Sequence, residues 1–196
     1  MPTGKKIFVS TQNKGKLKEI RSILGTGDFE FISVHTIDGF PDIEETGTSF
    51  EENAIIKAEE SYKLTGIPSL ADDSGLSVDC LDGAPGVYSA RYAGENADDE
   101  ENLRKVLGEI KNFLPPYKAR YVCVLAFYDG ERLITTQGEC EGELIMEKRG
   151  SNGFGYDPIF VPEGFIETMS ELNMETKNKL SHRFKALEKM KEALFK

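Results

Sequence analysis

The chain has 196 residues, a mass of 21.8 kDa and a formal net charge of −10 at pH 7. This length fits one domain, or one domain with two lobes, and the regular supply of Ile, Leu, Val and Phe excludes disorder. The acidic balance argues against nucleic acid and anionic membranes as partners, and no apolar run approaches the roughly 20 residues of a membrane span. The N-terminal apolar stretch is too short for a signal peptide, and the widely spaced Cys80, Cys123 and Cys140 predict buried thiols in a reducing cytoplasm.

In the first part of the chain, strand-like and helix-like patterns of apolar residues alternate. The expected elements are a strand at residues 5–10, a helix from the turn at 11–15 to Gly25, a strand at 29–34, a helix at 49–64 and a short buried strand at 68–71. Leu17, Ile20 and Leu24 form the apolar side of the first helix. Asp72 and Asp73 directly follow the short strand, and the loops after strands are where α/β proteins bind ligands.

In the second part, a hairpin interrupts the alternation. The expected elements are a helix at 98–114, two strands at 120–127 and 133–140 joined at Asp129-Gly130, a short strand at 159–161 and a helix at 181–195. The acidic run at 98–101 is explained by helix capping and the helix dipole. The inward residues of the last helix are expected to be Phe184, Leu187, Met190 and Leu194, so that neither His182 nor Arg183 is needed for packing. The whole pattern predicts an α/β fold with a mixed sheet, two lobes and a central cleft.

The start of the first helix is unusually basic, with no acidic residue before Glu19, although a helix N-terminus favours acids. The polar and basic residues of this turn and helix start are Thr11, Gln12, Asn13, Lys14, Gly15, Lys16 and Lys18. With the free backbone N–H groups of a helix start they predict a phosphate cradle, and a solvated lysine-rich turn is the alternative. The Walker A pattern is absent from the sequence. A second basic helix start, with Lys177 followed by His182 and Arg183, strengthens the case for an anionic ligand.

Carboxylates gather in two segments. Asp72 and Asp73 are adjacent, so one is expected to face the site and the other to support it. Asp42, Glu44 and Glu45 precede the second helix, where ordinary capping is the alternative explanation. Hard oxygen ligands suit Mg²⁺, which proteins bind through one or two carboxylates plus substrate phosphates. The only two histidines are His35 and His182, which argues against zinc.

The loop at residues 151–158 places two aromatic rings between glycines. Phe154 and Tyr156 predict a stacking surface for a base, and Asp157 could accept hydrogen bonds from the edge of that base. An aromatic loop tucked over the core explains the same pattern equally well.

Six segments resemble, in order, the motifs of the noncanonical purine nucleoside triphosphate pyrophosphatases, the inosine triphosphate and XTP pyrophosphatase family. They are TQNKGK at 11–16, EETG at 44–47 followed by Asn53-Ala54, ADDSGL at 71–76, GAPGVYSAR at 83–91, GFGYDP at 153–158 and SHR at 181–183. The resemblance covers nearly the whole chain. It implies one nucleoside triphosphate pyrophosphatase domain over residues 1–196, with an elongated mixed sheet, two lobes and a central active-site cleft.

The resemblance also implies Mg²⁺-dependent hydrolysis of ITP, dITP and XTP to the monophosphate and pyrophosphate by a cytoplasmic homodimer. By motif, Asp73 would be the base and a metal ligand, with Glu44 or its neighbour Glu45 as the second ligand. The residues that would bind the triphosphate are Thr11, Gln12, Asn13, Lys14, Gly15 and Lys16. Those that would hold the rest of the nucleotide are Ser74, Phe154, Gly155, Tyr156, Asp157, Lys177, His182 and Arg183.

Base discrimination is expected to be polar, because donors from Lys177, His182 or Arg183 favour a 6-oxo group over the amino group of adenine. Guanine shares the 6-oxo group, so the sequence does not predict how GTP is rejected. Two other functions compete. A pyrophosphatase of pyrimidine or modified nucleotides, resembling the septum-inhibiting Maf proteins, is disfavoured by the aromatic loop and the Ser-His-Arg segment. A nucleotide sensor without hydrolysis is disfavoured by the two intact acidic segments.

Overall fold

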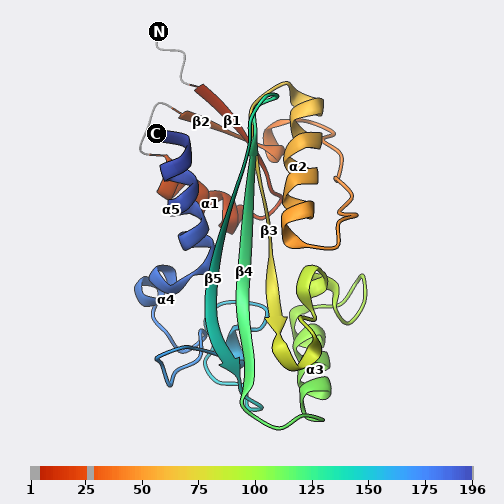
Figure 1. Cartoon of the computed structure of the whole chain (residues 1–196), viewed down its shortest axis with the longest axis vertical. Coiled ribbons are helices and arrows are strands. Elements are labelled where there is room, and N and C mark those ends of the chain that lie inside the picture. Colours follow the sequence, from red (N-terminus) through yellow and green to blue (C-terminus); the bar gives the residue numbers. More distant parts are fainter. Residues whose placement is uncertain (1–4, 26–28, 196) are drawn as a thin grey trace. The chain divides into compact units, whose positions relative to one another are not determined.

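A computed structural model describes residues 5–25 and 29–195, without the side chains of Lys5 and Lys14 (Figure 1). Its elements in chain order are β1 (Lys5–Ser10), α1 (Lys14–Leu24), β2 (Phe29–Ser33), α2 (Phe50–Thr65), β3 (Ser69–Val78), α3 (Asp99–Ile110), β4 (Tyr117–Tyr128), β5 (Leu133–Leu144), β6 (Phe160–Pro162), α4 (Met174–Leu180) and α5 (His182–Phe195). Within the described ranges, no helix is long and apolar enough to cross a membrane.

The described strands form one six-stranded sheet in the order β2-β1-β3-β4-β5-β6. β1 runs parallel to β2 and to β3, whereas β5 and β6 are antiparallel. The predicted α/β fold with a mixed sheet flanked by helices is therefore confirmed.

The chain divides into two compact units, each with its own apolar core. Unit 1 falls within Met1–Asp73, Cys123–Gly138 and Arg183–Lys196, and unit 2 comprises Ser74–Val122 and Glu139–His182. In unit 1, α1 and α5 cover one face of the sheet with buried residues that include Ile20 and Leu187, and α2 lies on the opposite face (Figure 1). In unit 2, the apolar core is formed by α3, the end of β3, the beginning of β4 and the end of β5. Leu103 and Phe160 are among its buried residues.

The helix boundaries follow local signals in the sequence. Asn13 caps α1, and Gly25 ends it by donating its N–H to Arg21 O. Ser49 caps α2, which ends at Gly66 in the left-handed region with φ of 67°. At α3, Asp98 and Glu101 form a reciprocal capping box, so the capping explanation of the acidic run is confirmed.

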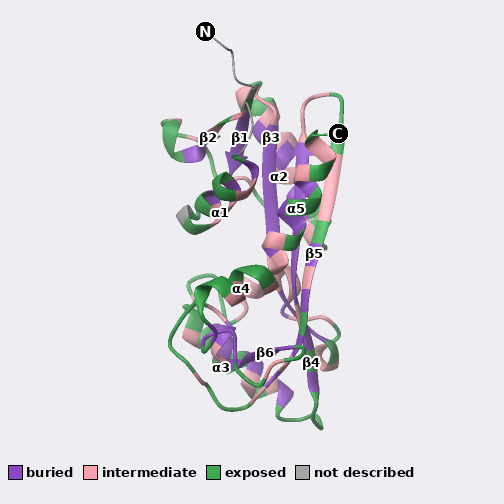
Figure 2. Cartoon of the chain, turned by 90° about the vertical axis from the view of Figure 1, so that its left-hand side faces the viewer, coloured by how far each residue is buried: buried purple, intermediate pink, exposed green. Residues whose placement is uncertain are grey.

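The short strand predicted at 68–71 is wrong, because β3 extends from Ser69 to Val78 and carries both aspartates inside it. Most of β3 is buried, as the upper part of the strand shows in Figure 2, and only Ser74 and Gly75 are half-buried. Its pairing with β1 stops at the Ser10–Ala71 register, and β3 continues because β4 is its neighbour on the other side. Asp72 and Asp73 thus lie just beyond the carboxyl end of β1, although they do not end β3 itself.

The predicted helices of the second part of the chain need correction. A separate helix, α4, precedes α5, and the predicted helix at 98–114 ends at Ile110. On α5, Leu187 and Met190 are buried as expected, but Phe184 is only half-buried and Arg183 is 6% exposed. The expectation that Arg183 is not needed for packing is therefore wrong, because the second residue of α5 faces the interior of unit 1.

Candidate active site

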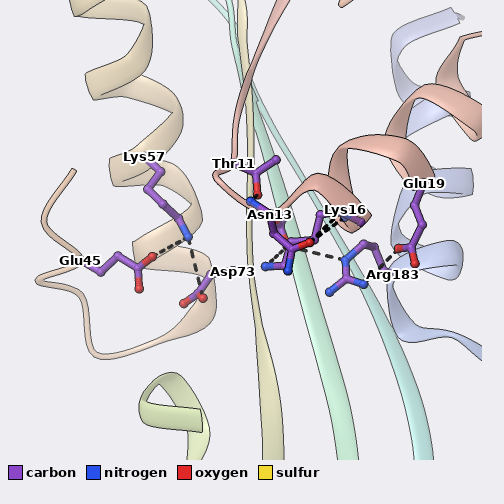
Figure 3. Close-up of polar contacts among 10 residues, drawn as sticks. Thr11, Asn13, Lys16, Glu19, Glu45, Lys57, Asp73 and Arg183 are labelled. Carbon is purple, nitrogen blue, oxygen red and sulfur yellow. Dashed lines mark hydrogen bonds and ion pairs between the residues drawn. The ribbon is translucent and has the colours of Figure 1, made fainter. Parts of the chain in front are cut away.

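Asp72 and Asp73 lie on opposite faces of β3, as the period of two in a strand requires. Asp72 Oδ2 lies 2.7 Å from Lys16 Nζ and 3.7 Å from Arg183 Nε. Asp73 Oδ2 accepts a hydrogen bond from Asn53 Nδ2 at 3.1 Å, and its Oδ1 lies 3.9 Å from Lys57 Nζ. Figure 3 shows Lys57, Glu45 and Asp73 on one side of β3, with Lys16, Glu19 and Arg183 on the other. Each carboxylate therefore has its own set of contacts, and the two side chains face different ways, as predicted for adjacent aspartates.

The Asp72 carboxylate is 2% exposed and remains ionised. Burial opposes its ionisation, but the charges of Lys16, Arg183 and Lys57 outweigh burial and hold the pKa of Asp72 below its ordinary value. Arg183 also reaches Glu19, whose Oε2 lies 3.0 Å from the guanidinium. Lys16 and Arg183, which lie unfavourably at the N-termini of α1 and α5, are thus neutralised by ion pairs within the protein.

The turn before α1 is organised by its own polar side chains. Thr11 Oγ1 accepts a hydrogen bond from the N–H of Asn13 at 3.2 Å. Asn13 Oδ1 accepts from the N–H groups of Gly15 and Lys16 at 2.8 and 3.1 Å, so these two donors, expected to be free, are already bonded. Gln12 Nε2 donates to Asp42 at 3.1 Å. The side chain of Lys14 lies outside the described part of the structure.

Lys57 joins two of the predicted acidic segments. Its ammonium lies 2.7 Å from Glu45 Oε1 and 3.9 Å from Asp73 Oδ1. Burial alone would lower the pKa of Lys57. The nearby negative charges of Asp72, Asp73 and Glu45 raise it by more than burial lowers it, so the pKa lies above its ordinary value. Glu44 is exposed and forms no ion pair within the described residues. Among those residues there is also no group of three or more His, Cys, Asp or Glu side chains that could hold a metal ion.

Asp157 is the centre of the polar contacts in unit 2, where it is 5% exposed. Its Oδ2 accepts hydrogen bonds from Lys177 Nζ at 2.6 Å and from the N–H of Phe154 at 3.0 Å, and its Oδ1 accepts from the Tyr121 hydroxyl at 3.1 Å. Gly153 makes this close approach possible, because a Cβ there would lie 2.2 Å from Asp157 Oδ2 and 2.4 Å from Lys177 Nζ. Three predicted site residues of the loop and α4 therefore meet at one carboxylate.

The expectation that Phe154 and Tyr156 both form an exposed stacking surface is wrong for Tyr156. Phe154 is 64% exposed, but Tyr156 is buried in the core of unit 2 and donates its hydroxyl to Ser89 O at 2.8 Å. The alternative, an aromatic loop tucked over the core, describes Tyr156 correctly. The Gly155 N–H is also engaged, because it donates to Asp99 Oδ2 at 2.8 Å.

Three residues beside the predicted site were given no role by the sequence: Asn53, Lys57 and Tyr121. Asn53 and Lys57 are four residues apart in α2 and therefore share a helix face, which is a signal that the sequence already carries. Tyr121 carries no such signal, because its contacts with Asp157 and His182 join segments distant in sequence. Ser74 is half-buried in β3, at the start of unit 2.

The fold and these side chains define an α/β protein in which two consecutive aspartates, Asp72 and Asp73, lie in one strand of the sheet. Basic or amide side chains contact each of them. The chain belongs to the Ham1 family, which matches residues 7–193. It is 46% identical to a dITP/XTP pyrophosphatase of Oceanobacillus iheyensis, over 97% of this chain and 98% of that protein. It is 47% identical to a dITP/XTP pyrophosphatase of Geobacter sulfurreducens, over 96% of each chain. A solved structure of a HAM1 protein from Coxiella burnetii superposes with a TM-score of 0.91 at 44% identity, covering 97% of this chain and 98% of that one.

Proposed function

We propose that the chain hydrolyses noncanonical purine nucleoside triphosphates, namely dITP, ITP and XTP, to the monophosphate and pyrophosphate. The observation that carries the proposal is the full-length similarity to proteins named dITP/XTP pyrophosphatase, at 46% and 47% identity. Because that similarity spans the chain, residues 1–196 are proposed to work as a single pyrophosphatase domain.

Asp73 is the proposed general base. Its carboxylate is held by Asn53 and Lys57, so it is oriented to take a proton from an attacking water. Lys16 and the N-terminus of α1 would bind the triphosphate, since a helix start offers positive charge to phosphate oxygens, which would compete with Asn13 Oδ1 for the N–H groups of Gly15 and Lys16. Thr11, Gln12, Lys14 and Ser74 complete the proposed contacts with the sugar and phosphates.

Asp73 and the acidic segment at Glu44 and Glu45 offer the carboxylate oxygens that a hard divalent cation such as Mg²⁺ prefers. Asp73 and Glu44 would hold it, because Glu45 is occupied by Lys57 at 2.7 Å whereas Glu44 is exposed. A cluster of protein ligands is not required, since Mg²⁺ sites of this kind use one or two carboxylates together with substrate phosphates. When bound, the cation supplies positive charge against the phosphate oxygens.

The base would be held in unit 2. The exposed ring of Phe154 can stack on a purine, and Lys177 and His182 can donate hydrogen bonds to a 6-oxo group. Arg183, expected beside the base, is instead engaged by Glu19 and Asp72, which favours a role for it in holding Asp72. Gly155, Tyr156 and Asp157 are proposed to shape this pocket from within the loop.

Pyrophosphate release tests the proposal directly. The purified chain is assayed with dITP, XTP, dGTP, dATP, dTTP and UTP, with Mg²⁺ and with EDTA in its place. We expect pyrophosphate and the monophosphate from dITP and XTP, and no release in EDTA. A preference for dTTP or UTP would favour the Maf-like alternative, and binding of dITP without turnover would favour a sensor.

The proposed assembly is a homodimer that acts in the cytoplasm, where nucleoside triphosphates are made and used. The dimer rests on the resemblance of the motifs alone. Its test is the molar mass of the purified protein by light scattering, at several protein concentrations, with and without dITP.

A further inference from the structure

Tyr121 is a buried tyrosine of β4 that contacts two residues of the predicted base pocket. Its hydroxyl donates to Asp157 Oδ1 at 3.1 Å, and its ring stacks on the imidazole of His182 with centroids 5.1 Å apart and planes inclined by 13°. The ring also packs against Phe160, with centroids 4.6 Å apart. Phe160 is fully buried, so the Tyr121 ring is anchored to the core of unit 2.

The Tyr121 hydroxyl completes the set of donors around the Asp157 carboxylate. Oδ2 is already bonded by Lys177 Nζ and the Phe154 N–H, and only the Tyr121 hydroxyl bonds Oδ1 among the described contacts. With both oxygens held, the carboxylate cannot rotate without losing a bond. Burial, reinforced by the charge of Asp157, raises the pKa of Tyr121 well above its ordinary value, so the hydroxyl keeps its proton and stays a donor.

Packing alone does not require this hydroxyl. Tyr121 belongs to an apolar cluster in which a phenylalanine ring would fill nearly the same space. Tyr117 lies four residues earlier on the same face of β4 and in the same cluster, but its hydroxyl lies 3.4 Å from the carbonyl oxygen of Phe113, away from the predicted site. The two tyrosines therefore differ in what their hydroxyl groups reach.

We infer that Tyr121 is a positioning residue that holds Asp157 through its hydroxyl and His182 through its ring, and so sets the geometry of the base pocket. This inference rests on the proposed function, in which the purine lies against these side chains. Tyr121 itself would not touch the substrate. Its hydroxyl would act on the binding of the base more than on the hydrolysis of the phosphates.

Steady-state kinetics on dITP and XTP separate this role from a structural one. In Tyr121→Phe we expect KM to rise about threefold to tenfold, with kcat largely unchanged. This is the change in affinity expected from the loss of one hydrogen bond. Tyr117→Phe is the matched control, because it removes a buried-cluster hydroxyl that bonds Phe113 O instead of Asp157, and it should leave kcat and KM unchanged. Wild-type protein that releases no pyrophosphate from dITP would contradict the proposed function. An active wild type whose KM is unchanged in Tyr121→Phe would overturn the positioning role.

Histidine NMR provides a readout that does not depend on activity. The chain has two histidines, and only His182 stacks on a tyrosine among the described ring contacts, so His35 is an internal reference. Stacking on Tyr121 shifts the His182 ring protons upfield. Tyr121→Leu should remove that shift and leave the His35 signals in place, whereas Tyr121→Phe should retain it. His182 signals that stay unchanged in Tyr121→Leu would overturn the inferred link.

Discussion

Lys16 Nζ lies 2.7 Å from Asp72 Oδ2, so the most basic turn of the chain is anchored to a carboxylate that is 2% exposed. The neighbouring Asp73 faces the other side of β3 and meets Asn53 and Lys57. One aspartate therefore holds the proposed phosphate-binding turn, and the next is the proposed general base. This division of roles makes the consequences of changing each residue different.

Asp73→Asn should abolish turnover and leave the fold intact. The amide keeps the shape of the side chain but loses the proposed base and metal ligand, which should slow hydrolysis of dITP at least about a thousandfold, or roughly 4 kcal/mol in the barrier. Asp79→Asn is the matched control, because Asp79 is a half-exposed carboxylate paired with Arg120. Pyrophosphate release and thermal unfolding are measured for both variants. More than a tenth of wild-type activity in Asp73→Asn would exclude it as the base.

Lys16→Met should weaken the binding of every triphosphate by a similar factor. The substitution keeps the aliphatic stem but removes the charge proposed to meet the phosphates, which all substrates share. KM for dITP and for the poorer substrate dGTP should rise together. Lys18→Met, an exposed lysine of the same helix, serves as the comparison. If Lys16→Met altered only the ratio between dITP and dGTP, Lys16 would belong to base recognition.

Arg183→Ala should destabilise the protein, contrary to the expectation from its sequence position. The guanidinium is 6% exposed and lies between Glu19 and Asp72, and breaking a buried ion pair costs about 3 kcal/mol or more. Lys185→Ala, on the exposed side of α5, should change the free energy of unfolding much less. Denaturant unfolding of both variants measures the difference. Equal stabilities would show that Arg183 is dispensable for packing after all.

Glu44→Gln and Glu45→Gln should differ in their dependence on Mg²⁺. Loss of a proposed ligand in Glu44→Gln should raise the Mg²⁺ concentration needed for half-maximal activity about tenfold or more. Glu45→Gln removes the partner of Lys57 at 2.7 Å and should alter activity at saturating Mg²⁺ instead. Titration of each variant with Mg²⁺ distinguishes them. The reverse pattern would transfer the ligand role to Glu45.

Stability should fall steeply in acid because of Asp72. Its pKa is lower in the folded protein than in the unfolded chain, so the unfolded chain binds the proton first as the pH drops below about 4. The contribution of Asp72 is therefore present above that pH and is lost as the pH falls toward the folded pKa. Asp72→Asn should start from a lower melting temperature but lose less of it between about pH 5 and about pH 2. An unchanged slope would show that other carboxylates govern the acid transition.

Elements defined by local signals could be predicted from the sequence, and those defined by distant pairing could not. β1, α1 and the ends of α2 follow from apolar periodicity, from the caps at Asn13 and Ser49, and from Gly25 and Gly66. The extension of β3 past Ala71 cannot be predicted locally, because its neighbouring strand β4 begins only at Tyr117. In the same way, the motif is enough to predict a role for Asp73, whereas its contacts with Asn53 and Lys57 of α2 cannot be read from the motif.

The burial of individual side chains was the least predictable feature of the site. Tyr156 and Phe154 are two residues apart in one glycine-rich loop, yet one is in the core and the other is 64% exposed. Arg183 carries a charge that usually indicates the surface, and it is buried because Asp72 and Glu19 neutralise it. Such outcomes depend on partners from other segments, which a single sequence does not identify.

The internal pairing of the basic side chains affects how an anion approaches this protein. Lys16, Lys57 and Lys177 each lie within 2.7 Å of a carboxylate oxygen, so these three lysines project little uncompensated positive charge into solvent. The surrounding molecule has a formal net charge of −10. A nucleoside triphosphate is therefore repelled at long range and attracted only once it is close enough to compete for these ammonium groups. The electric field of the protein therefore slows the association of the triphosphate with the site. Because dissolved salt screens this field, added salt should speed up association.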